Sequence, residues 1–320
     1  MDSGRVLLAK ALRCESVERP AFLPLLNRLA ARLAGCSVQE MQSDAGLWTG
    51  GLAAATKLLS ADAVAVAYDP TLIAEGLGAQ ITWKDDSPRL AGVGEIGAVM
   101  PESPEANGRL GVALEVMRRL FPTMAATCGC VALLTGPVTT AAMLYGPSQA
   151  VERARDLKAS LLRCVEAACE SRPDLLLFME GMGFLAGGVT PAHKRIYGTL
   201  KNVAAYYNIP VGLFLRGYAE KDDLSQLAAL GLDCVALGSA ASGAFPAAEQ
   251  AWAVSGGRAA VPYSLPGDDL ARVPEELTKA TQMSRGTGAG FFVIVAEPDR
   301  EEFDMVMVQR AAEAIAAVRL

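Results

Sequence analysis

Charged side chains directly follow several short apolar runs of this sequence, and their types suit acid–base chemistry and anion binding. Asp69 follows AVAVAY, Glu180 follows DLLLFM and Arg216 follows VGLFL. A carboxyl group can give or take a proton during a reaction, and a guanidinium binds carboxylates through paired hydrogen bonds. Ser264 and Glu297 occupy similar positions at the ends of two later runs. These five residues are the first candidates for a functional site.

The apolar runs themselves predict the strands that carry these residues. None of the eight runs alternates between apolar and polar residues, which is typical of parallel strands covered by helices. Amphipathic stretches lie between the runs. Eight strand–helix units predict an α/β fold, a TIM (β/α)8 barrel formed by residues 1–320 as one domain. The predicted strands are 21–26, 63–68, 130–135, 174–179, 211–215, 234–239, 259–264 and 291–296.

In a TIM barrel, chemistry takes place where the strands end at their carboxyl side, so the candidate residues should meet at one mouth. The alternative is that each one is simply solvated where a strand reaches the surface. Asp69 is the strongest catalytic candidate, because Tyr68, Pro70 and a following helix bracket it in a half-buried place. Residues 79–107 are too long and too polar for a plain connection, and we expect a small excursion over the mouth.

Three basic residues outside the strand ends also have types that could bind or react. Arg28 and Arg32 lie four residues apart, which places both on one face of a helix after the first strand. If that face looks into the mouth, the two form a carboxylate clamp; otherwise it is a solvated helix face. His193 is the sole histidine, and we predict a solvated position on a helix surface rather than a role as acid or base.

Composition and cysteine usage narrow the class of protein. Cys128 and Cys130 could place two sulfurs on one face, but no third or fourth ligand is near, so no metal site is predicted. The odd number of cysteines, seven, fits a reducing compartment, and we expect a cytoplasmic protein. No run reaches the ~18 apolar residues of a membrane span. A net charge of -6 without a basic run argues against nucleic-acid binding and favours a small-molecule substrate.

Several motifs together resemble the uroporphyrinogen decarboxylase superfamily. The opening ALRCESVERPAFLPL is similar to its N-terminal signature of a short helix, a V-x-R-P turn and the first strand. With the weaker matches VGLFLRG and LAALGLDCVALGS, the likeness covers nearly the whole chain. The other matching stretches are ADAVAVAYDPTLIAEGLGAQITW at the second strand, LLTGPVTTAAMLYG at the third, and DLLLFMEGMG with VTPAHKRIYGTLKNVAAY at the fourth.

The resemblance implies a TIM barrel, a homodimer and one of two activities. Decarboxylases of the superfamily remove acetate carboxyls from uroporphyrinogen without a cofactor, using an aspartate after strand two and arginines that hold carboxylates. Methyltransferases pass a methyl group to or from a corrinoid protein, commonly onto a zinc-bound thiolate. Asp69 matches the aspartate, which implies that it faces a cationic or NH-bearing part of the substrate.

The sequence departs from both branches at specific positions. Phe214 and Arg216 stand where the zinc branch carries His-x-Cys, so the usual metal ligands are absent. Arg28 and Arg32 keep the spacing of the decarboxylase arginines but lie somewhat later. Tyr145 lies close to the position of the tyrosine expected after the third strand, and FFVIVAEPD lacks the C-terminal histidine. These departures make haem synthesis doubtful.

The segment LNRLAARLAGCSVQEMQSDAGLWTGGLAAATKLL, with its G-x-S turn before a helix, resembles the methyltransferase branch more closely. We therefore predict corrinoid-linked methyl transfer without the thiolate zinc and without a tightly bound cofactor, the corrinoid being presented by a partner protein. Asp69 and Glu180 would position or protonate the methyl donor, and Arg216 would hold an anionic group. Cofactor-free decarboxylation of a pyrrole-type acid and a non-catalytic ligand-binding barrel are the alternatives. The predicted substrate-binding residues are Arg28, Arg32, Tyr68, Tyr145, Ser264 and Glu297.

Overall fold

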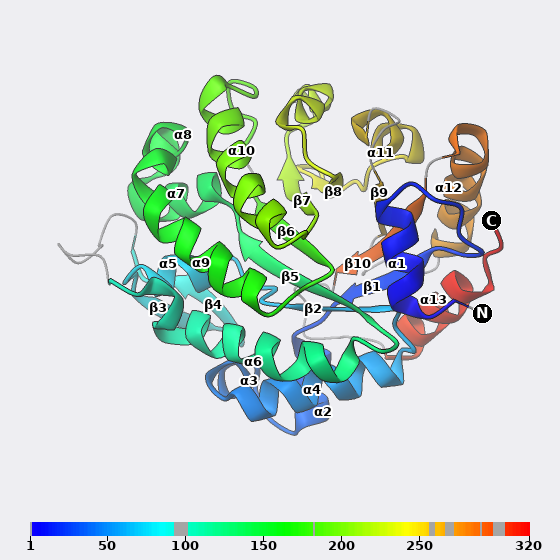
Figure 1. The fold of residues 1–320 in the computed structure, drawn as a ribbon, viewed down its shortest axis with the longest axis horizontal. Coiled ribbons are helices and arrows are strands. Elements are labelled where there is room, and N and C mark those ends of the chain that lie inside the picture. The colour runs from blue at the N-terminus through cyan, green and yellow to red at the C-terminus, as the bar shows by residue number, and fades with distance from the viewer. Residues whose placement is uncertain are drawn as a thin grey trace.

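The computed structural model describes residues 2–92, 102–181, 183–255, 260–265, 272–288, 290–296 and 305–320. Within these residues, parallel strands form a TIM barrel with the helices around them, which confirms the predicted fold class (Figure 1). All eight predicted strands are present, and their bounds agree with the apolar runs to within a few residues. They are β1 (Ala21–Leu25), β2 (Ala63–Val66), β5 (Gly129–Thr135), β6 (Leu175–Glu180), β7 (Val211–Tyr218), β8 (Cys234–Ala240), β9 (Val261–Leu265) and β10 (Phe291–Ala296).

The strands follow one another around the barrel in chain order. One sheet has the order β2-β5-β6-β7-β8 and the other β1-β10-β9. A parallel bridge between Cys234 and Ala260 joins β8 to the chain just before β9. On the other side, the Asp62 amide donates to the Phe22 carbonyl of β1 at 3.0 Å, directly before β2 begins. These two links bring the sheets together into the barrel.

Helices and short 3-10 segments fill the connections and cover the outer face of the strands. The helices are α1 (Gly4–Leu12), α2 (Arg28–Ala34), α3 (Val38–Ser43), α4 (Ala45–Leu58), α5 (Leu72–Gly76), α6 (Gly108–Met124), α7 (Pro137–Tyr145), α8 (Ala150–Arg153), α9 (Lys158–Glu170), α10 (Pro191–Tyr206), α11 (Ala248–Ser255), α12 (Val273–Thr287) and α13 (Met305–Ala317). The 3-10 segments are η1 (Pro104–Ala106), η2 (Pro147–Gln149), η3 (Ala154–Leu157) and η4 (Leu224–Leu230). No helix in the described ranges is both long and apolar enough to span a membrane.

The strands are apolar on both faces because each face packs against a different layer. Successive side chains of a strand point to opposite sides, so Leu133 faces the barrel interior while Leu134 packs in the outer core. Leu23, Ala65 and Leu177 fill the interior together with α1, which closes the N-terminal end of the barrel. This packing explains why the runs lack the alternating pattern of a half-exposed sheet.

Aspartates that precede strands connect neighbouring strands at the N-terminal end of the barrel. Asp62 accepts from the Phe22 amide of β1 at 2.9 Å, and its two oxygens receive Arg19 at 2.6 and 2.8 Å. Arg19 is the arginine of the V-x-R-P turn, so this motif has a structural role. Asp174 and Asp233 likewise accept from amides of β5 and β7.

A small antiparallel hairpin follows β2 and lies at the opposite end of the barrel from α1 (Figure 1). It consists of β3 (Ile81–Lys84) and β4 (Ser87–Leu90). Asp85 and Asp86, the two turn residues, have φ of 50° and 53°. Two-residue turns of this kind need positive φ at both positions, which aspartate tolerates better than most residues. Residues 81–90 of the predicted excursion therefore form an ordered hairpin, and its residues 104–106 form η1.

Candidate active site

A cavity of about 250 Å³ lies at the C-terminal end of the barrel, between the ends of β2 and β7 and the β3–β4 hairpin. Its lining includes four of the predicted site residues: Arg28, Tyr68, Asp69 and Arg216. The hairpin contributes residues 85–89 to the lining. The carboxyl ends of strands are where TIM-barrel enzymes carry their active sites, and this cavity is the candidate active site.

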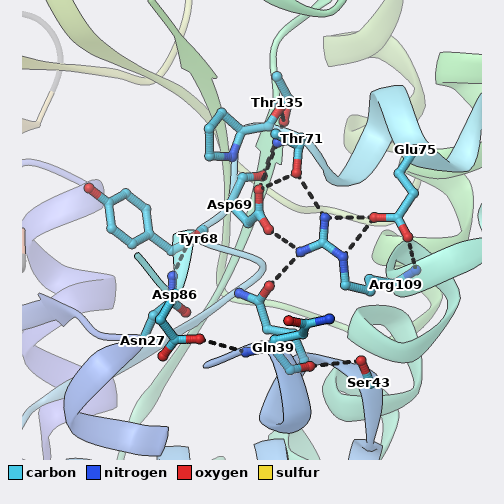
Figure 2. A network of polar contacts seen from close by, with 12 residues as sticks. Asn27, Gln39, Ser43, Tyr68, Asp69, Thr71, Glu75, Asp86, Arg109 and Thr135 are labelled. Carbon is cyan, nitrogen blue, oxygen red and sulfur yellow. Dashed lines mark hydrogen bonds and ion pairs between the residues drawn. The ribbon is translucent and has the colours of Figure 1, made fainter. Parts of the chain in front are cut away.

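The carboxylate of Asp69 is bound on both oxygens by protein groups (Figure 2). One oxygen accepts from the Thr71 amide at 2.8 Å and from the Thr71 hydroxyl at 2.7 Å, and the other is paired with the guanidinium of Arg109. Arg109 also donates to Glu75 at 2.7 Å and to the side-chain oxygen of Gln42. Asp69 is only 2% exposed, so the predicted half-buried position is wrong.

The Asp69 side chain points to the outer helices rather than into the open part of the cavity. Figure 2 shows the ring of Tyr68 on one side of this strand end and Arg109 on the other, with the Asp69 carboxylate turned toward Arg109. Arg109 lies on α6 and is not among the site residues predicted from the sequence. Its signal was available, because Arg109 shares the buried face of α6 with Ala113 and Val116, and an arginine on an apolar face needs a buried partner.

Glu180, at the end of β6, is fully buried and also saturated with hydrogen bonds. It accepts from the Val138 amide at 3.0 Å, from the Thr139 amide at 2.7 Å, and from the hydroxyls of Thr139 and Tyr197. The two amides are the first free donors of α7, so Glu180 caps that helix. Burial raises the pKa of the Glu180 carboxyl, although the hydrogen bonds oppose this shift.

Arg216 extends from β7 toward the cavity. Phe214, two residues earlier on the same strand, faces the barrel interior, and strand alternation gives Arg216 the same side. The Arg216 guanidinium carbon lies 5.4 Å from the centre of the Tyr68 ring, a cation–π contact across the cavity wall. Through this contact, the end of β7 and the end of β2 meet at the barrel mouth.

Residues 4–170 match the sequence profile of the uroporphyrinogen decarboxylase (URO-D) family. The chain belongs to this family. The matched residues include the V-x-R-P turn, Asp69 and the G-P-x-T turn at the start of α7, so the resemblance predicted from these motifs is confirmed. No curated protein sequence matches the chain significantly.

The fold of this URO-D family member matches solved structures over nearly its whole length. A methyltransferase from Methanosarcina mazei has a TM-score of 0.77 at 17% sequence identity, with 98% of each chain covered. A B12-independent methionine synthase from a Shewanella species, in complex with selenomethionine, has a TM-score of 0.58 at 13% identity, covering 94% of this chain and 96% of that chain. At such identities, the likeness establishes the fold.

The remaining predicted substrate-binding residues of the URO-D family member are spread around the molecule. Arg32 is exposed and lies outside the cavity lining, so Arg28 and Arg32 do not form one clamp there. The Tyr145 ring packs under Arg153, whose guanidinium carbon is 4.2 Å from the ring centre. Ser264 borders another cavity, of about 230 Å³, and its buried hydroxyl lacks a hydrogen-bond partner among the described residues. Glu297 lies outside the described residues.

His193 is buried, at 1% exposure, and the predicted solvated position is wrong. Its Nδ1 accepts from the Thr190 amide at 3.1 Å, and Nε2 lies 3.1 Å from the Phe184 carbonyl oxygen. Because a carbonyl can only accept, Nε2 carries the proton and the imidazole is neutral. His193 caps the N-terminus of α10 and bonds to the loop before this helix. It is not part of the cavity lining.

The burial of His193 makes stability depend on pH in a defined direction. Burial lowers the pKa of His193, so below about pH 6.5 the unfolded chain takes up the proton before the folded chain does. We expect the free energy of unfolding to fall as the pH drops through this window, with a contribution of at most about 1.4 kcal/mol per pH unit. Urea denaturation at pH 7 and at pH 5 (about half a unit above and about one and a half units below this value) would measure it. His193→Gln removes the titrating group, and superimposable pH profiles of the variant and the wild type would contradict the prediction.

The thiols of Cys128 and Cys130 in this URO-D family member are buried and structural. Burial raises the pKa of Cys128 and of Cys130 to about 12, so both remain protonated and are poor metal ligands. Among the described residues, no three His, Cys, Asp or Glu side chains are placed to hold a metal ion. Phe214 and Arg216, at the strand position that carries His-x-Cys in the zinc branch, do not fit a thiolate-bound zinc either, because one is apolar and the other cationic.

Proposed function

We propose that this protein is a methyltransferase whose small substrate binds in the cavity between Tyr68, Arg216 and the β3–β4 hairpin. The observation that carries the proposal is the position and size of this cavity, about 250 Å³ at the C-terminal ends of β2 and β7. Membership of the URO-D family and the full-length structural likeness to the Methanosarcina mazei methyltransferase support it. We further propose that a partner protein presents a corrinoid as methyl acceptor or donor.

The cavity size favours methyl transfer over decarboxylation of uroporphyrinogen. Pockets for drug-sized ligands measure about 300–1,000 Å³, and a tetrapyrrole with eight carboxylates is larger than such a ligand. A cavity of about 250 Å³ suits a methyl donor smaller than such a ligand. The second argument is Asp69, because the decarboxylase role needs this carboxylate to face the substrate, whereas here Arg109 and Thr71 bind it.

In the proposed mechanism, Arg216 acts on the group that the methyl leaves. When a methyl group departs as a cation equivalent, the remaining oxygen, nitrogen or sulfur gains negative charge. A guanidinium held at the cavity wall by the Tyr68 ring stabilises this charge through hydrogen bonds that strengthen as the charge develops. A corrinoid, when presented, would supply the atom that takes up or releases the methyl group.

Asp69 and Glu180 receive positioning roles in this proposal in place of the predicted general-acid role. Each carboxylate would have to give up protein hydrogen bonds before it could exchange a proton with a substrate. Asp69 instead fixes the chain directly after Tyr68, and Glu180 fixes the start of α7. Both therefore shape the mouth while Arg216 contacts the substrate.

The central experiment combines the protein with its cognate corrinoid protein and a panel of methyl donors, and follows the corrinoid absorption spectrum. We expect methylation with at least one donor, and we expect Arg216→Ala to lower kcat/KM about 10²- to 10³-fold, the usual effect of removing one charge-stabilising donor. Arg216→Lys should recover part of the loss, because it retains the charge but not the planar fork. Arg118→Ala, on the outer helix α6, is the matched control and should leave the rate unchanged.

Three outcomes would contradict the proposal. A corrinoid spectrum that stays constant with every donor, in the presence of the cognate corrinoid protein, would exclude corrinoid methylation. Formation of coproporphyrinogen from uroporphyrinogen would establish the decarboxylase alternative, which is consistent with membership of the URO-D family. Tight ligand binding by calorimetry without any turnover would identify a non-catalytic barrel.

A further inference from the structure

The β3–β4 hairpin is fastened to three different helices around the cavity. Arg28 of α2 donates to the Asp85 carbonyl at 3.0 Å and to the Ser87 hydroxyl at 3.1 Å. The Asp86 carboxylate accepts from two backbone amides at the start of α3, at 2.8 and 3.2 Å. These contacts hold the hairpin turn against the barrel mouth.

The third attachment joins the hairpin to Arg109, which forms a buried ionic network with Asp69 and Glu75. The guanidinium carbon of Arg109 lies 4.9 Å from the centre of the Trp83 ring on β3. Arg109 is itself fixed by Asp69 and Glu75. The hairpin is therefore an ordered wall of the cavity, and the side chains that it presents have defined positions.

Positive groups of the protein balance most of the negative charge of the acidic residues that line the cavity. Asp69 is paired with Arg109, and Asp86 caps the amides of α3, where a negative charge is favourable. Asp85 is exposed at the hairpin turn. Against these acids, the same lining contains three arginines, namely Arg28, Arg89 and Arg216. The balance of charge at the cavity therefore favours an anionic ligand.

Arg89 is the arginine that the hairpin adds to the cavity. It lies on β4, paired with Thr82 of β3, and its side chain is exposed to solvent at the cavity. Within the described ranges, its guanidinium has neither a hydrogen-bond acceptor nor an ion-pair partner. A guanidinium keeps all its donors charged at any physiological pH and matches the oxygens of a carboxylate or phosphate.

We infer that Arg89 is a specificity-determining residue that binds an anionic group of the substrate, and that the hairpin selects anionic over neutral substrates. This inference rests on the proposed function, because it assigns the substrate class of the same cavity. The anionic group has the oxygen geometry of a carboxylate or a phosphate. The methyl-bearing end of the substrate would then lie toward Arg216 and Tyr68, which line the same cavity.

The test measures binding rather than methyl transfer, so that it does not depend on the corrinoid. Thermal unfolding and calorimetry of the full chain would compare 3-methoxybenzoate with the neutral 3-methoxybenzamide, which has nearly the same shape, and with inorganic phosphate. We expect the wild type to bind at least one anion and to bind the benzamide more weakly. Arg89→Gln and Arg89→Glu should raise the Kd of that anion about tenfold or more, the effect of one lost charge-assisted hydrogen bond.

Controls separate recognition by Arg89 from a general charge effect. Arg89→Lys should bind with intermediate affinity, because lysine keeps the charge without the fork. Lys57→Glu makes the same charge change as Arg89→Glu near the end of α4, at the other end of the barrel, and should leave the Kd unchanged. The inference is wrong if no anion binds the wild type, if Arg89→Glu binds as tightly as the wild type, or if Lys57→Glu weakens binding equally.

The two proposals can fail separately. Binding of an anion that depends on Arg89, in a protein that methylates no corrinoid, would refute the methyl transfer and retain the anion site. Methyl transfer from neutral donors at a rate that Arg89→Gln leaves unchanged would refute the anion site and retain the methyltransferase.

Discussion

Replacing Arg109 by methionine is expected to lower the free energy of unfolding by about 3–5 kcal/mol, the usual cost of breaking a buried ion pair on one side. The Arg109 side chain is only 7% exposed and pairs with the buried Asp69 and the partly exposed Glu75. Without it, the buried Asp69 loses its counter-ion in a place that water does not reach, and the partly exposed Glu75 loses its ion-pair partner. Urea denaturation monitored by far-UV circular dichroism would measure the loss.

The helix that carries Arg109 also offers a matched control. Arg118→Met removes an ion pair with Glu115 whose side chains are half exposed, and exposed pairs contribute less than about 1 kcal/mol. Similar losses in the free energy of unfolding for Arg109→Met and Arg118→Met would show that the buried ion pairs of Arg109 contribute no more than an exposed pair. Combining Arg109→Met with Asp69→Asn should cost less than the sum of the two single changes, because the neutral amide no longer needs a counter-ion.

Glu180→Leu is expected to lower the free energy of unfolding by a similar amount, about 3–5 kcal/mol. The carboxylate receives four donors from α7 and Tyr197, and each buried donor left without an acceptor costs about 1–3 kcal/mol, part of which is recovered by relaxation. The start of α7 would also lose its cap. Thermal and urea unfolding would measure the effect.

Glu166→Leu provides the comparison for Glu180, because Glu166 is exposed on α9 and should change stability by no more than about 0.5 kcal/mol. A second readout comes from Tyr197→Phe. In the wild type, this change leaves Glu180 short of one donor, whereas in the Glu180→Leu background the hydroxyl has already lost its acceptor. Equal costs in both backgrounds would show that the Tyr197–Glu180 contact contributes nothing.

Strand alternation explains which strand-end residues can be placed from the sequence. Along β6, Leu177 and Met179 face the barrel interior, so Glu180 must face the helices, as it does. On β7, Phe214 faces the interior and Arg216 follows on the same side. Counting residues in steps of two along each apolar run is therefore enough to separate these two candidates.

The same counting fails for Asp69. β2 ends at Val66, and Ala67 then adopts a φ of 72°, a left-handed conformation that non-glycine residues rarely take. This turn rotates the following residues out of the strand pattern. The direction of Asp69 therefore depended on the position of Arg109, 40 residues later in the chain.

The sequence by itself determined the barrel, because continuous apolar runs separated by amphipathic stretches can bury both faces only between helices and a filled interior. It also determined the family, through the V-x-R-P, aspartate and G-P-x-T turns. Only the tertiary structure decided the partners of Asp69 and Glu180, the burial of His193 and the meeting of Arg89 with Arg216 at one cavity. Local patterns determine which face of an element is apolar, whereas the partner of a buried charge is set by how distant elements pack.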